Sequence, residues 1–83
     1  MAFAKLFESE KYGQLLLKID ENDEGEPEVR VYAEPPGLGV CSVAIDFKGE
    51  AGSYKAQAAF DAMAVQDAER LAAVIFNAAG VDA

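Results

Sequence analysis

Apolar residues occupy every second position in three stretches of the first half of the chain. The stretches are 14–20, 29–34 and 41–47, and their alternating apolar residues are Leu15, Leu17 and Ile19, then Val29, Val31 and Ala33, then Cys41, Val43, Ile45 and Phe47. Neighbouring side chains in a strand point to opposite faces, so this period predicts three strands with one buried face. Residues 2–8 are mostly apolar on both alternations, with Lys5 as the polar interruption among Phe3 and Phe7. We expect a first edge strand there, with a short helix as the alternative.

Turn-forming residues separate these stretches. The polar segment 8–13 ends in glycine, which predicts a hairpin connection. The segment 20–28 contains Asn, Asp and Gly for a tight reversal, and we expect Pro27 to end strand pairing early. The run Pro-Pro-Gly-Leu-Gly at 35–39 predicts a stiff connector. The strands are therefore expected to be antiparallel.

The alanine-rich second half shows helical spacing instead. The apolar residues of a first helical face are Ala56, Ala59, Phe60 and Met63, and those of a second are Ala68, Leu71, Ala72, Ile75 and Ala79. Ser53 is the expected N-cap, and Gly80 the expected stop. We favour two helices with a break near Ala64 and Val65, because one apolar stripe does not run straight through both segments. A single long helix is the alternative.

Strands followed by helices are typical of an α+β fold. We predict a single domain, 1–83, with a three- or four-stranded antiparallel sheet and one or two C-terminal helices packed on one face. Hydrophobic residues make up 52% of the chain, although many are alanines of little volume. The expected stability is modest, about 5 kcal/mol or slightly more. A homodimer that shares apolar surface would add to it.

The charge is strongly negative, with 15 acids against 7 bases and a net charge of −8. Nucleic acids and anionic membranes attract cationic proteins, so direct binding to either is not expected. An acidic surface keeps a protein in solution, or it meets a basic surface on a protein partner.

Few residues are available for catalysis. The chain has one cysteine and no histidine, which excludes an internal disulfide, the usual zinc sites and histidine-based catalysis. Cys41 shares the apolar side of its strand and is expected to be a small core residue. We therefore predict no enzyme activity, no cofactor and no metal site. A lone thiol and the lack of a long apolar run favour the cytoplasm, without a signal peptide or a membrane span.

The segment 20–28 is the strongest candidate for a binding surface. Six of its nine residues are acids, namely Asp20, Glu21, Asp23, Glu24, Glu26 and Glu28. We expect them to be exposed and to attract a basic partner, or, alternatively, only to solvate a turn and protect a strand edge. Tyr12, Tyr32 and Tyr54 are the aromatic candidates for a contact surface. Tyr32 shares its strand face with Arg30 and Glu34, a face which is expected to lie away from the helices, and we expect it to anchor a partner or to shield its own sheet.

Calcium binding is a further alternative for this segment. Asp20, Asn22, Glu24 and Gly25 resemble the opening of an EF-hand loop, which has oxygen ligands at alternate positions and glycine at the sixth. Val31 stands where such a loop needs its bidentate glutamate. The likeness covers six residues only, so we assign no metal ligand.

The short acidic chain, the acid-rich segment 20–28 and the order of sheet before helices resemble the small acidic proteins encoded by bacteriophages, anti-CRISPR proteins among them. This resemblance implies an inhibitor that acts in the cytoplasm of a bacterial host by binding a basic surface of a host protein. A structural or assembly protein is the second hypothesis. In it, the alanine-rich helices pair between subunits of a homo-oligomer.

Overall fold

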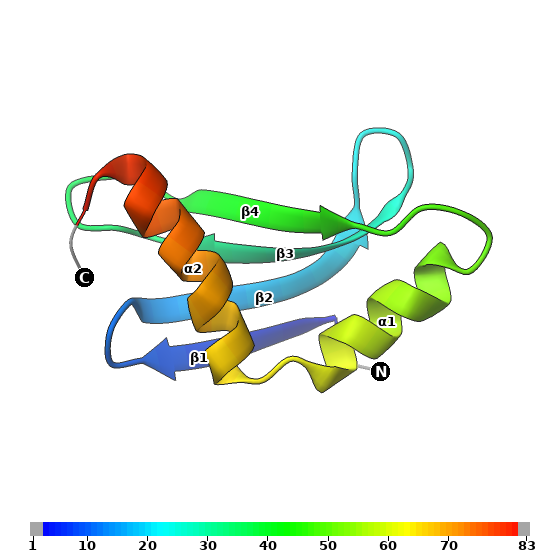
Figure 1. The fold of residues 1–83 in the computed structure, drawn as a ribbon, viewed down its shortest axis with the longest axis horizontal. Coiled ribbons are helices and arrows are strands. Elements are labelled where there is room, and N and C mark those ends of the chain that lie inside the picture. The colour runs from blue at the N-terminus through cyan, green and yellow to red at the C-terminus, as the bar shows by residue number, and fades with distance from the viewer. Residues whose placement is uncertain (1–2, 82–83) are drawn as a thin grey trace.

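The computed structural model describes residues 3–81 and contains a sheet with two helices on one side (Figure 1). The elements, in chain order, are β1 (Ala4–Ser9), β2 (Gly13–Glu21), β3 (Pro27–Ala33), β4 (Cys41–Asp46), α1 (Gly52–Ala62) and α2 (Val65–Ala79). The predicted α+β fold is confirmed, with four strands and two helices. Residue 2 of the predicted first strand lies outside the described residues.

The four strands form an antiparallel meander in the order β1-β2-β3-β4. Leu17 of β2 lies opposite Lys5 of β1 and Val31 of β3, and Val31 lies opposite Val43 of β4. Odd-numbered residues of all four strands therefore share one face. Helix α2 crosses this face and contacts every strand, whereas α1 contacts β2 and β3 (Figure 1).

The core lies between this face and the helices. Its buried residues are Leu15, Leu17, Val29, Val31, Ala33, Ala56, Phe60, Ala68, Ala72, Ile75 and Phe76. Alanines on both helices allow a close approach to the sheet, and the phenylalanines fill the remaining volume. The predicted stripe on α2 included Ala79, which is exposed, and omitted Phe76, which is buried. Ile75 and Phe76 are both buried, so the buried face of α2 is wider there than the predicted stripe, and it ends before Ala79.

The helix boundaries confirm the predicted break but correct the first start. Helix α1 begins at Gly52 after Ala51, and no side chain caps it, so Ser53 is not its N-cap. A side chain at position 52 would lie 2.6 Å from the carbonyl oxygen of Phe47, so this close approach requires glycine, and the helix starts two residues earlier than predicted. Helix α2 starts after Ala64 and stops at Gly80, which has the left-handed conformation that glycine adopts without strain.

Lys5 lies on the helix-covered face of β1, next to the partly buried Phe7. Its Nζ donates to the carbonyl oxygens of Phe60 at 2.6 Å, Asp61 at 3.2 Å and Met63 at 3.3 Å. These carbonyls lie at the C-terminal end of α1, where helix oxygens lack partners within the helix and the helix dipole is negative. Lys5 thus joins the first strand to the end of α1.

Candidate protein-binding surface

The acidic turn is shorter than the sequence predicted. Asp20 and Glu21 belong to β2, Pro27 and Glu28 belong to β3, and each acid is paired across the two strands. Pro27 does not end the strand pairing, because proline lacks only the backbone N–H donor and keeps its carbonyl oxygen as an acceptor. Its carbonyl oxygen accepts a hydrogen bond from the Phe47 amide at 2.9 Å. The turn itself is 22–26.

Asn22 organises this turn. Its Oδ1 accepts hydrogen bonds from the amides of Glu24 and Glu26, both at 2.9 Å, and its Nδ2 donates to Glu26 Oε1 at 3.1 Å. Gly25 supplies the positive φ of 79° that closes the loop. Calcium binding would need the same Asn22 oxygen as a ligand, so this geometry does not favour it. Within residues 3–81, no group of three or more Cys, Asp or Glu side chains is placed to hold a metal ion.

The acids of 20–28 differ in their exposure. Asp20, Glu21, Asp23 and Glu24 are exposed, and we call these four residues the acidic tip. Glu26 is half-buried, and its carboxylate accepts a hydrogen bond from the Asn22 side chain. Glu28 is buried, contrary to the expectation that the whole segment faces solvent. The reason is its position inside β3, between paired strands on both sides.

Glu28 is held by Arg30, two residues along the same strand. The Arg30 Nε lies 2.6 Å from Glu28 Oε2, and Nη2 lies 3.0 Å from Oε1, which makes the pair bidentate. The Arg30 Nη1 also donates to Ser42 Oγ at 2.8 Å. The hydrogen bonds to Glu28 raise the pKa of Arg30 above its ordinary value. Glu28 is thus committed within the fold and is not free to attract a partner.

Even-numbered strand residues form the second face of the sheet, which we call the open face because the helices lie on the other side. The register arranges this face in four rows across the strands. The row nearest the acidic tip is acidic and consists of Asp20, Glu28 and Asp46. The next row is cationic, with Lys18 and Arg30 beside Ala4 and Ala44. The third row is apolar, with Leu6, Leu16 and Tyr32 beside Ser42, and the last row consists of Glu8 and Gln14. Glu34 and Val40, just beyond β3 and β4, continue the last row. This face is therefore banded by charge.

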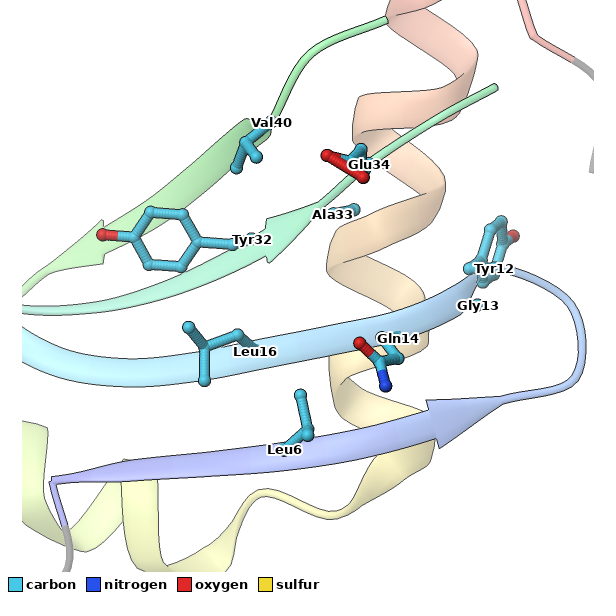
Figure 2. A pocket seen from close by; sticks show the side chains of 9 residues that line it. All are labelled: Leu6, Tyr12, Gly13, Gln14, Leu16, Tyr32, Ala33, Glu34 and Val40. Carbon is cyan, nitrogen blue, oxygen red and sulfur yellow. The ribbon is translucent and has the colours of Figure 1, made fainter. Parts of the chain in front are cut away.

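Tyr32 lies on the open face, as predicted, but apart from the acidic tip. It is opposite Leu16, four residues from Asp20, and this spacing corresponds to about 13 Å along a strand. Figure 2 views this face with α2 behind the sheet and shows Leu6, Leu16 and the Tyr32 ring on the near side. Together with Val40 they line a shallow hollow of about 500 Å³. The residues predicted as one site thus form two separate surfaces.

The remaining residues considered in the sequence, two tyrosines and the cysteine, lie outside these two surfaces or contribute to the core. The Tyr12 ring packs edge-on against Phe76, with ring centroids 4.8 Å apart, and so belongs to the core side. Tyr54 is exposed on α1. Cys41 is half-buried against the core, and its Sγ lies 3.5 Å from the carbonyl oxygen of Gly39. Its placement fits a small core residue.

Comparisons with protein-family models, with curated proteins and with solved structures give no match to this chain. They assign it to no family. Neither helix in residues 3–81 is long and apolar enough to cross a membrane. The function must therefore be argued from the two surfaces themselves.

Proposed function

We propose that this protein acts without catalysis, by binding a basic surface of another protein through its acidic tip. The observation that supports the proposal is a group of exposed carboxylates at the end of β2 and on the turn that follows it, which hydrogen bonds to Asn22 organise. The ion pairs among residues 3–81 are Glu28–Arg30 and Asp67–Arg70, so no described cation neutralises the tip. Its negative potential is available to a partner.

The tip is suited to accelerate association more than to supply affinity. Two unit charges 4 Å apart in water attract by only about 1 kcal/mol, so a few exposed pairs give little binding energy. Charge complementarity can nevertheless raise association rates from roughly 10⁶ M⁻¹s⁻¹ towards 10⁸ M⁻¹s⁻¹ or more at low salt. Since the net charge of −8 has the same sign as the tip, the whole molecule is expected to reinforce this attraction.

The resemblance to small acidic phage proteins provides the biological setting of the proposal. The partner is a bacterial host protein with a lysine- or arginine-rich surface, and binding blocks that surface in the host cytoplasm. A channel or groove that holds nucleic acid has such a surface. The carboxylates of the tip then take the place of phosphates.

The first experiment is a pull-down of the tagged protein from a bacterial lysate at low and at high salt, with bound proteins identified by mass spectrometry. We expect one dominant partner that is retained at low salt and lost at high salt, because screening weakens attraction between exposed charges. If the bait retains only itself at both salt concentrations, the proposal is wrong.

Binding kinetics with that partner then test the tip. The triple variant Glu21→Gln, Asp23→Asn and Glu24→Gln removes three charges and leaves Asn22 in place. The control variant Glu8→Gln, Glu10→Gln and Asp61→Asn removes the same charge from other exposed positions. We expect the tip variant to associate about tenfold more slowly and with less salt dependence, and the control to change much less. Equal effects of both variants would mean that net charge acts and the tip does not.

A further inference from the structure

The apolar row of the open face has no cover among the described residues. Leu6 is 59% exposed, and Leu16 and Tyr32 are half-buried between the strands. They lie side by side on β1, β2 and β3 (Figure 2). A row of this kind at the centre of a sheet face is typical of a contact surface.

Opposite charges lie on the two sides of this row. Lys18 and Arg30 lie on the side towards the acidic tip, and Glu8 and Glu34 lie on the other side. A second copy can be placed face to face with the first by a rotation of 180° about an axis that runs along the apolar row, across the strands. Each strand then lies over the same strand of the second copy, and the two run in opposite directions. Arg30 of each copy then faces Glu34 of the other, with the two guanidinium N–H groups that Glu28 and Ser42 do not use. The open face is therefore complementary to itself.

Charge also selects this rotation over the alternative. A two-fold axis parallel to the strands would lay β2 over β3 and bring Lys18 opposite Arg30 of the second copy, twice by symmetry. Like charges that face each other across an interface are unfavourable. Both axes lay the apolar rows on each other, but of the two only the axis along the apolar row brings a cation, Arg30, opposite an acid.

We infer that two copies of this chain associate through their open faces, with the apolar rows in contact and two Arg30–Glu34 pairs across the interface. This inference is independent of the proposed function. The antiparallel arrangement places the two acidic tips at opposite ends of the dimer, outside the contact. Such a dimer presents two tips and could bind a repeated basic partner with avidity.

The size of the face predicts a weak dimer. Four strands about 4.8 Å apart, with about six residues each at a rise of about 3.3 Å, give roughly 400 Å² per copy. Stable interfaces bury about 800 Å² per partner. In addition, each copy carries a net charge of −8 and repels the other at a distance. We expect a dissociation constant on the order of 100 µM at physiological salt.

Analytical ultracentrifugation tests this inference, over concentrations from roughly tenfold below to tenfold above that constant. The variants are Leu6→Lys, which places two lysines in contact near the axis, and Glu34→Lys, which turns each charge pair into a repulsion. The control is Val74→Lys on α2, because Val74 is 54% exposed, close to the 59% of Leu6, and lies on an element of the other face. All three positions are exposed, so folding is expected to persist, and circular dichroism checks it.

The wild type and Val74→Lys should shift from monomer to dimer mass, while Leu6→Lys and Glu34→Lys remain monomers at the highest concentration. If one of the two variants fails to fold, the other decides. A wild type that stays monomeric throughout overturns the inference, as do Leu6→Lys and Glu34→Lys chains that dimerise like the control. If the wild type is monomeric but these two variants lose a partner from the pull-down, the open face binds another protein. The acidic-tip variant still dimerises, because the tips lie outside the contact and its lower net charge weakens the repulsion between copies, so the two proposals fail separately.

Discussion

Replacing Arg30 by methionine tests the most unusual interaction in the sheet. The change keeps a long aliphatic side chain but removes both hydrogen bonds that Glu28 receives, at 2.6 Å and 3.0 Å. The Glu28 side chain is only 4% exposed, so water cannot replace the lost donors without a local opening of the sheet. A buried carboxylate without a partner is costly because its charge is poorly solvated.

The magnitude follows from the exposure of the two partners. Breaking a fully buried ion pair costs about 3–5 kcal/mol. The Arg30 side chain is 31% exposed, so some water can enter the space it leaves, which lowers the expected loss. Asp20 and Asp46 lie opposite Glu28 on the neighbouring strands and oppose an unpaired negative charge. We therefore expect a loss of about 3 kcal/mol, a large part of the roughly 4–12 kcal/mol typical of 83 residues.

Removing the charge on the other partner should be milder. In Glu28→Gln, Arg30 keeps Ser42 and its contact with water, and the new amide oxygen still accepts a hydrogen bond. We expect a loss of about 1 kcal/mol. The double variant Arg30→Met with Glu28→Leu should lose less than the sum of its single changes, because an apolar pair of similar volume can replace a buried ion pair.

Urea unfolding near neutral pH measures the wild type, Arg30→Met, Glu28→Gln, Glu28→Leu and the double variant, and unchanged m-values show that the free energies are comparable. Since the pKa of Arg30 is raised, the stability it contributes is present below its unfolded pKa and is lost only as the pH rises through the folded value. Both values are strongly alkaline, so titration of this group does not affect the comparison. If Arg30→Met lost no more stability than Glu28→Gln, the carboxylate would have to be hydrated, and its burial would not be the reason for the pair.

Two other changes test contacts between distant segments. Lys5→Met should lower the free energy of unfolding by about 2 kcal/mol, because carbonyls at the end of α1 lose a charged donor. Lys5→Arg keeps a charged donor and should lose less stability than Lys5→Met when both are compared by thermal unfolding. Gly52→Ala should cost about 2 kcal/mol, because the new methyl group would lie 2.6 Å from the carbonyl oxygen of Phe47. Gly39→Ala is the matched control, since no atom lies within 4 Å of the added carbon, and its loss in the same urea assay should be under about 0.5 kcal/mol. Equal losses for the two glycines would argue against the close approach at position 52.

Local patterns were sufficient to predict most of the elements. Alternation defines a strand within a few residues, so the buried faces of β2, β3 and β4 could be read from positions such as Leu17, Val31 and Val43. The break before α2 followed in the same way from a change in the direction of the apolar stripe. Tyr32 was assigned to the face away from the helices by counting along a single strand. These properties depend on neighbours in the chain, which the sequence states directly.

The candidate site depended on contacts that no local pattern contains. The acids from Asp20 to Glu28 look equivalent in the sequence, yet strand pairing buries Glu28 and leaves the acidic tip exposed. Lys5 looked like the polar interruption of an apolar strand until the end of α1 was placed against it.

The open face shows the same division between sequence and structure. Its residues could be assigned to single strands, but their order in charged and apolar rows requires the register between strands. Register depends on which face of the sheet is buried and on the geometry of the turns that join the strands. The sequence by itself therefore determined which side chains share a face of each strand. Only the tertiary structure decided which of them are neighbours, because burial and charge pairing arise between residues that are far apart along the chain.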